Sequence, residues 1–332
     1  MVRLKTIDAH AAGEPLRLIV DGFPSPRGKT LAEKREWAVR HADRLRRVLM
    51  REPRGHRDMY GAVLTEPSSP GSHAGVLFMN GETFGAMSGH GIIAVATIAL
   101  ERGLIVPGGD GRSLTFDTAA GTVRATAHIG DGGRVERVMF VNVPSFVMRG
   151  GVEIALATRR VRADIAFGGA FYAIVDGESV GVPLDGHHIP ELRRLGVGIK
   201  QAIDRAETIV HPLEPRLTGL DGTIFTGPPH DSSVDLRSVA VFANGAIDRS
   251  AGGTGTAAVM TVIDAMGLLD DQRAFVQESI IGTTFSGRVV GRTMVGEYPA
   301  IVPEIQGSAW ITGEQTFSVD PDDPLGDGFT VE

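Results

Sequence analysis

The chain has 332 residues, a formal net charge of −7 at pH 7 and no cysteine. The lack of cysteine excludes disulfides, thiolate metal sites and a thiol catalyst, and the acidic balance argues against a nucleic-acid-binding surface. The composition, 42% hydrophobic and 22% charged, is that of a globular protein, long enough for two domains of about 150 residues each. No segment approaches the ~18 apolar residues of a membrane span, and we expect a cytoplasmic protein without a membrane partner.

The first quarter of the chain alternates apolar and polar segments. Strands are predicted over residues 4–7 and 16–20, joined by a polar loop over 8–15. Apolar residues at helical spacing predict an amphipathic helix over 30–49. We interpret the basic run from Arg35 to Arg54 as largely a solvent-facing helix surface. Strands over 62–64 and 75–80 follow.

The central feature is the loop Met87-Ser88-Gly89-His90-Gly91, followed by the apolar stretch 92–104. Apolar residues on nearly every side predict a buried helix. The first N–H groups of a helix have no partner within it, and the helix dipole favours an anion there. The loop therefore predicts an anion site, and a carboxylate would suit it.

A second loop repeats this pattern when Ser88 is aligned with Gly252. The alternative is two unrelated glycine-rich turns. However, the identical residues stay in register as far as the ends of both predicted helices, where the glycines are typical of C-caps. The repeat predicts a duplicated α/β unit. The identical pairs are Gly89/Gly253, Gly91/Gly255, Ala94/Ala258, Val95/Val259, Thr97/Thr261, Gly103/Gly267 and Leu104/Leu268.

The rest of the chain is also predicted to contain both strands and a helix. Pro144 interrupts an apolar segment where a second cycle of elements begins, which indicates a boundary. Several short strands are predicted after residue 279. The other expected elements are strands over 114–118, 122–128, 134–142, 152–156, 159–167 and 239–244, and a helix over 190–208.

Several polar residues in these loops invite a functional interpretation, each with a structural alternative. Ser88 is either an acid/base or only a helix N-cap, and His90 either its relay or a hydrogen-bonded structural histidine. Asp248 suits a substrate with an ammonium group, or simply forms a turn. The three histidines His10, His56 and His90 lack metal-ligand spacing and an accompanying carboxylate motif, so no metal site is predicted.

The two loops resemble the signature loops of the proline racemase superfamily. This superfamily holds proline racemase, 4-hydroxyproline 2-epimerase and trans-3-hydroxy-L-proline dehydratase. Blocks along the whole chain resemble family landmarks as well. They are Asp8-Ala9-His10 with Gly13-Glu14-Pro15, Glu52-Pro53-Arg54-Gly55-His56, Asn142-Val143-Pro144-Ser145-Phe146, Gly168-Gly169-Ala170-Phe171-Tyr172 and Asp322-Asp323-Pro324.

The resemblance implies an α/β (α+β) fold of the diaminopimelate-epimerase type, with two similar halves, each a sheet wrapped around a central helix. We expect residues 1–143 with 309–332 in one half and 144–308 in the other. It also implies cofactor-independent proton chemistry at Cα of a proline-like imino acid. The implied substrate-binding residues are Gly89, His90, Gly253 and Thr254 for the carboxylate, Asp248 for the ring nitrogen, Gly252 in the second loop, and Tyr60 and Phe242 for the ring.

The chain departs from the family at the two acid/base positions. The racemases carry a cysteine in each loop and the dehydratases a cysteine and a threonine, whereas this chain has Ser88 and Gly252. Racemisation needs an acid/base on both faces of Cα, and glycine offers no side chain. Dehydration of trans-3-hydroxy-L-proline needs a group on one face only, because its Cα hydrogen and hydroxyl lie on the same side.

We therefore expect a lyase acting on trans-3-hydroxy-L-proline, with Ser88 and His90 as the catalytic residues and L-proline left unracemised. The alternatives are a 4-hydroxyproline epimerase or proline racemase that recruits another group beside Gly252, and a non-catalytic relative that binds an imino acid. The only expected partner is the small substrate, and the protein is expected to be a monomer or a homodimer.

Overall fold

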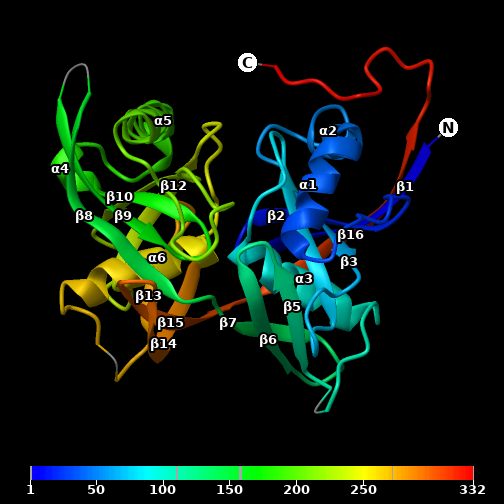
Figure 1. The fold of residues 1–332 in the computed structure, drawn as a ribbon, viewed down its shortest axis with the longest axis horizontal. Helices are drawn as coiled ribbons and strands as arrows, with labels where there is room; N and C mark the ends of the chain where they lie inside the picture. The colour runs from blue at the N-terminus through cyan, green and yellow to red at the C-terminus, as the bar shows by residue number, and fades with distance from the viewer. Residues whose placement is uncertain (1, 110, 157–158, 271, 332) are drawn as a thin grey trace. The chain divides into compact units, whose positions relative to one another are not determined.

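The computed structural model describes residues 2–109, 111–156, 159–270 and 272–331 (Figure 1). The chain forms two compact units, which are described separately. The first contains residues 1–140 and 308–332, and the second contains residues 141–307.

The first unit is built on a curved sheet of eight strands in the order β7-β6-β5-β4-β3-β2-β1-β16. At the two ends of this order, Ser308 Oγ, just before β16, donates a hydrogen bond of 2.7 Å to Glu136 O in β7. The strands are β1 (Val2–Ala11), β2 (Glu14–Asp21), β3 (Tyr60–Thr65), β4 (Ala74–Asn80), β5 (Ser113–Thr118), β6 (Gly121–Ile129), β7 (Val135–Val141) and β16 (Ala309–Val319).

The predicted buried helix lies at the centre of this unit. Helix α3 (Gly89–Glu101) contacts β1, β2, β3, β6 and β16, and its residues from Gly89 to Ala99 are all buried. Apolar side chains on every face allow the helix to pack against strands all around it. Helices α1 (Leu31–His41) and α2 (Asp43–Met50) pack against β4.

The second unit repeats this plan as a closed barrel. Its strands follow the order β14-β13-β12-β11-β10-β9-β8-β15, and β14 also pairs with β15. Helix α6 (Gly253–Ala265) contacts β8, β9, β10, β14 and β15. The strands are β8 (Ser145–Ala155), β9 (Arg160–Phe167), β10 (Phe171–Asp176), β11 (Gly222–Gly227), β12 (Leu236–Phe242), β13 (Phe275–Glu278), β14 (Thr284–Val295) and β15 (Tyr298–Gly307).

Three further helical segments belong to the second unit: α4 (Gly177–Val180), the 3₁₀ turn η1 (Gly186–His188) and α5 (Ile189–Ala206), which packs on β11 and β12. Helices α3 and α6 are the central helices expected in the two halves, so that expectation is confirmed. Within the described residues, no helix combines the length and apolarity needed to cross a membrane.

Both central helices end in the same way, as the repeat predicted. Gly103 and Gly267 have φ of +61° and +72°. The next N–H groups, of Leu104 and Leu268, donate to Ala99 O and Ile263 O. This is the Schellman motif, in which a left-handed residue lets the chain turn back on the last carbonyls.

The structure corrects two expected elements near the N-terminus. The segment 8–15 is not a loop, because β1 and β2 continue through it and only Ala12 (φ +51°) and Gly13 (φ +95°) form the turn. The helix expected over 30–49 is two helices that meet at Ala42, whose φ of −127° is not helical. Neither glycine nor proline marks this break, so periodicity alone could not reveal it.

The C-terminal part also differs from expectation. Instead of several short strands after residue 279, it forms the long strands β14, β15 and β16. A bulge between Val289 and Gly291 accommodates an irregularity in β14 while its pairing with β15 continues.

Candidate active site

The first signature loop lies at the start of α3, where Ser88 is the N-cap residue. Its side chain is 4% exposed, and Oγ accepts a hydrogen bond of 3.0 Å from the Gly91 N–H group. A serine that accepts from the first turn satisfies one of its unpaired N–H groups. The same N–H group and the helix dipole would stabilise negative charge on Oγ.

His90 lies directly beside this hydroxyl. Its Nδ1 is 3.1 Å from Ser88 Oγ, and burial lowers the pKa of the imidazole to about 3. The ring is therefore neutral at pH 7, and with its proton on Nε2 it accepts the Ser88 O–H hydrogen through Nδ1. The ring of Tyr60, from β3, meets the His90 ring edge-on with centroids 4.8 Å apart.

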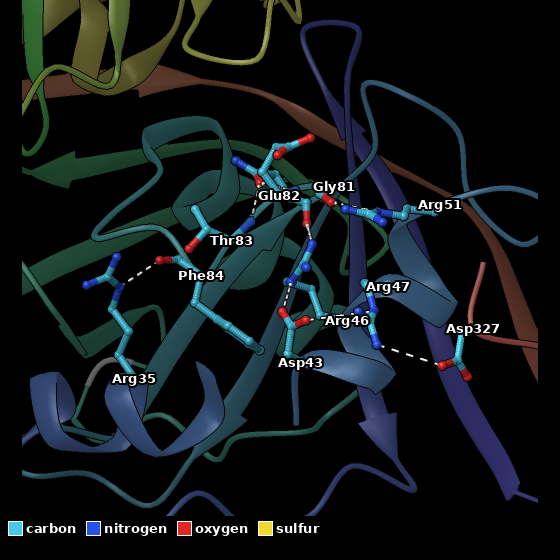
Figure 2. A network of polar contacts seen from close by, with 11 residues as sticks. Arg35, Asp43, Arg46, Arg47, Arg51, Gly81, Glu82, Thr83, Phe84 and Asp327 are labelled. Atoms are coloured by element: carbon cyan, nitrogen blue, oxygen red, sulfur yellow. Dashed lines mark hydrogen bonds and ion pairs between the residues drawn. The ribbon is translucent and has the colours of Figure 1, made fainter. Parts of the chain in front are cut away.

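Three arginines hold the segment that leads from β4 into this loop (Figure 2). Arg46 donates to Asn80 O at 2.9 Å, Arg51 to Gly81 O at 2.9 Å, and Arg35 to Phe84 O at 2.6 Å. Together they form an arginine clamp that ties helices α1 and α2 to backbone carbonyls a few residues before Ser88.

The arginine clamp corrects our interpretation of the basic run as largely solvent-facing. Arg46 is only 2% exposed and is paired with Asp43, its Nε lying 2.7 Å from Oδ1. A buried guanidinium is tolerated when its donors are satisfied in this way.

The second signature loop connects β12 to α6 in the other unit. Asp248 is 3% exposed, and its Oδ1 accepts from both the N–H group and the hydroxyl of Ser250, at 2.8 and 2.7 Å. Ser250 Oγ in turn accepts from the Gly252 N–H group at 3.0 Å. Burial raises the pKa of the Asp248 carboxyl to about 6, against the opposing effect of the Ser250 hydrogen bonds and Arg249.

Helix α6 begins without any side-chain cap. Its N-cap is Gly252, so the N–H groups of Gly253 and Thr254 in its first turn remain available for an anion. Thr254 Oγ1 lies 2.9 Å from Tyr172 Oη. Gln277 Nε2 donates to Ala251 O at 3.0 Å and so ties the loop to β13.

The predicted site residues therefore fall into one group in each unit. In the first unit Ser88, Gly89 and His90 lie together with Tyr60; in the second, Asp248 lies beside Gly252, Gly253 and Thr254. Phe242 is the last residue of β12. Its N–H group donates to Ala246 O and closes the turn before Asp248. The structural roles considered for Ser88 and Asp248, N-cap and turn former, are present as well, since both side chains accept local N–H groups.

His10 and His56 are the other two histidines that were considered from the sequence. His10 Nδ1 accepts the Gly13 N–H group at 3.1 Å, and its ring stacks on Trp310. His56 is exposed. Across the described ranges, no set of three or more histidine, cysteine, aspartate or glutamate side chains is placed to hold a metal ion.

Sequence reasoning missed the residues that support the loops. Tyr172 lies in the segment Gly168-Gly169-Ala170-Phe171-Tyr172, which was noted only as a landmark. No local sequence pattern indicated the roles of Gln277 and the arginine clamp, because these roles depend on partners distant along the chain.

The chain is similar to known proteins over nearly its whole length. The proline racemase family model matches residues 6–330. A trans-3-hydroxy-L-proline dehydratase of Bacillus cereus is 44% identical over 98% of this chain and 97% of its own length. A proline racemase of Acetoanaerobium sticklandii is 36% identical over 99% of this chain and 98% of its own.

A solved structure shares the whole fold. The hydroxyproline epimerase of Agrobacterium vitis, with bound trans-4-hydroxy-L-proline, has a TM-score of 0.93 and 30% identity, covering 100% of this chain and 95% of that one. The fold is thus of the diaminopimelate-epimerase type, and these relatives are named as enzymes. The chain belongs to the proline racemase family.

Proposed function

We propose that this protein is a lyase that dehydrates trans-3-hydroxy-L-proline, with Ser88 as the acid/base. The observation that carries the proposal is the buried Ser88 hydroxyl, 3.1 Å from the Nδ1 atom of His90 and bonded to the Gly91 N–H group. Relatives named trans-3-hydroxy-L-proline dehydratase support the choice of substrate.

Substrate binding in this proposal uses the remaining residues of the two loops. The N–H groups of Gly89, His90, Gly253 and Thr254 hold the carboxylate, because the first turns of helices favour anions. Asp248 pairs with the ring nitrogen. Tyr60 and Phe242 pack against the apolar ring carbons.

The chemistry consists of proton transfers and the loss of one hydroxyl. An ordinary serine is a weak base, so Ser88 first passes its hydroxyl proton to His90 Nδ1, and the Gly91 N–H group stabilises the alkoxide that results. The alkoxide takes the Cα proton, the electron pair of that bond forms the Cα–C3 double bond, and the C3–O bond breaks. The leaving hydroxide takes this proton from Ser88 and departs as water. His90 then returns its proton to Ser88, and the enamine tautomerises to the cyclic imine.

A second candidate function is epimerisation of a hydroxyproline. One observation favours it: the buried Asp248 carboxyl lies beside Gly252, where a Cβ atom would be 3.1 Å from Oδ2, and burial raises its pKa to about 6. Among the relatives, the Agrobacterium vitis structure is named a hydroxyproline epimerase.

Proton NMR of the wild-type protein with trans-3-hydroxy-L-proline in D2O tests the proposal. We expect the substrate signals to disappear and those of the cyclic imine to appear. L-proline is the matched control, since it has no hydroxyl to lose. Inversion at Cα without loss of the hydroxyl would instead establish the epimerase, and calorimetric binding without any turnover would establish a non-catalytic binder.

A further inference from the structure

The first turn of helix α6 lacks the support that a helix start usually has. Its N-cap, Gly252, has no side chain to accept an N–H group, and the absence of such a cap usually destabilises a helix start. A capping side chain would, however, occupy one of the N–H groups that hold the substrate carboxylate in the proposed function. These N–H groups stay both ordered and free only if the turn is held from another side.

The turn between β9 and β10 lies directly against this helix start. Gly168 follows the last residue of β9, and a Cβ atom built on it would lie 2.2 Å from Thr254 O and 2.6 Å from Ala258 N. These two atoms are four residues apart, the spacing of a helical hydrogen bond. Because glycine has no Cβ atom, the backbone of this turn can approach the first turn of α6 so closely.

Buried hydrogen bonds hold the turn in place. Asn142 Nδ2 donates to Gly168 O at 2.8 Å, and the Gly168 N–H group donates to Ala170 O at 3.0 Å. Asn142 is 3% exposed, and its own N–H group donates to Pro303 O in β15 at 2.8 Å. The barrel of the second unit therefore fixes the turn against α6.

Tyr172, from the start of β10, adds a side-chain contact to the same helix turn. Its Oη lies 2.9 Å from Thr254 Oγ1, and the two residues are 4% and 5% exposed. Elsewhere in the central helices, the hydroxyls of Thr97 and Thr261 donate to the carbonyl four residues earlier. Thr254 Oγ1 is bonded to Tyr172 instead, so its side chain ties the first turn of α6 to the sheet.

We propose that the segment 168–172 holds the first turn of α6 in place of an N-cap, and that Tyr172 is thereby a positioning residue for the substrate carboxylate. This inference rests on the proposed function, in which the N–H groups of Gly253 and Thr254 bind that carboxylate. The contacts reach the carbonyl oxygen and the side chain of Thr254 and do not use its N–H group. Support from this side orders the turn without competing with a bound anion.

Calorimetric binding of L-proline and of L-prolinamide tests this inference. The amide keeps the ring nitrogen but lacks the negative charge, so it does not depend on an anion site. Tyr172→Phe should weaken binding of L-proline about 3–10-fold, as expected for one neutral hydrogen bond, and leave that of L-prolinamide unchanged. Tyr298→Phe is the matched control, because it removes a hydroxyl in the same unit from a ring that stacks on Phe146, and it should change neither affinity.

A double substitution shows whether Tyr172 acts through Thr254. Thr254→Val removes the partner hydroxyl but keeps the backbone N–H group, so Tyr172→Phe should have no further effect on L-proline binding in this background. A residue that only stabilises the fold would not change the ratio of the two affinities. Unchanged L-proline binding in Tyr172→Phe, equal weakening for both ligands, or a full effect in the Thr254→Val background would overturn the inference.

Gly168→Ala tests the backbone contact in the same way. Its methyl group would displace the first turn of α6, so L-proline should bind more weakly than to Tyr172→Phe. Gly198→Ala is the matched control, since a Cβ atom there meets nothing within 4 Å. Wild-type affinity in Gly168→Ala would contradict the role of the turn, and if this variant does not fold, the Tyr172 variants decide.

The wild-type protein separates the inference from the proposed function. If it dehydrates trans-3-hydroxy-L-proline and prefers L-proline to L-prolinamide, but this preference does not depend on Tyr172, only the inference fails. If it binds both ligands equally well, the carboxylate site itself fails. If it neither dehydrates the substrate nor binds L-proline, the proposed function fails, and the inference with it.

Discussion

The two central helices end alike but begin differently. Both close in a Schellman motif on a glycine, Gly103 or Gly267. At the start, α3 is capped by the side chain of Ser88, whereas α6 has Gly252 and no side-chain cap. The two copies of the repeat are therefore alike where their helices end. They differ where the helices begin, at the residues proposed to act on the substrate.

The titratable groups at the two starts also behave oppositely. Burial lowers the pKa of His90 to about 3 and raises that of Asp248 to about 6. In each case burial disfavours the charged form, so the first loop keeps a neutral hydrogen-bond acceptor and the second a carboxyl that readily holds a proton. The two helix starts therefore carry different proton chemistry, and they do so from different positions of the repeat, because His90 aligns with Thr254 and Asp248 with Phe84.

The largest stability difference between the helix ends should come from adding a methyl group at their glycines. Gly252 and Gly267 share a φ of +72°, but a Cβ at Gly267 meets nothing within 4 Å, whereas one at Gly252 lies 3.1 Å from Asp248 Oδ2. Gly267→Ala should lower the free energy of unfolding by about 1–2 kcal/mol through backbone strain. Gly252→Ala should cost more.

Urea unfolding of the two variants measures this difference. The backbone of Gly252, with ψ of +117°, also lies outside the left-handed helical region, so equal losses would contradict both the backbone strain and the contact with Asp248 expected at this position. The same crowding predicts that cysteine at residue 252 would be strained.

A second effect should appear in the pH dependence of unfolding. His90 binds a proton in the unfolded state below its ordinary pKa of 6.5 but not in the folded state until about pH 3. Its contribution to stability is therefore complete above pH 6.5 and is lost as the pH falls, by up to about 1.4 kcal/mol per pH unit. His90→Gln should flatten this acid-side loss.

Asp248 should give the opposite slope. Its pKa rises from 3.8 to about 6 on folding, so its contribution is complete below pH 3.8 and is lost as the pH rises through 6. Asp248→Asn should remove that loss and stabilise the protein at neutral pH relative to mildly acidic pH. Parallel shifts in the two variants would contradict the comparison of the loops.

The sequence could predict the features that depend on residues adjacent along the chain, but not those that depend on distant residues. The central helices, their glycine ends and the placement of Ser88 at an N-cap follow from adjacent residues, and the structure confirms them. The break at Ala42 has no local marker. Nor could the burial of Arg46 be predicted, because it depends on Asn80 O, which lies far along the chain.

The site residues divide in the same way. The glycine loops and Asp248 stood out as motifs, and the hydrogen bond between Ser88 and His90 follows from their spacing at a helix start. The arrangement around Asp248 did not, since it depends on Ser250 directing both of its hydrogen bonds to Oδ1. Sequence shows which polar residues are near, but not which of their atoms bond to one another.

Turnover of trans-3-hydroxy-L-proline by Ser88→Ala is the most direct test of the central claim, that Ser88 is the acid/base of a dehydratase. We predict that its kcat falls at least ~100-fold, as for loss of an acid/base, while calorimetry shows nearly unchanged binding because the backbone N–H groups remain. Ser88→Cys is the matched control and should keep or raise kcat, since a thiol with a pKa of about 8.5 ionises far more readily than a hydroxyl. Undiminished dehydration by Ser88→Ala would contradict the account.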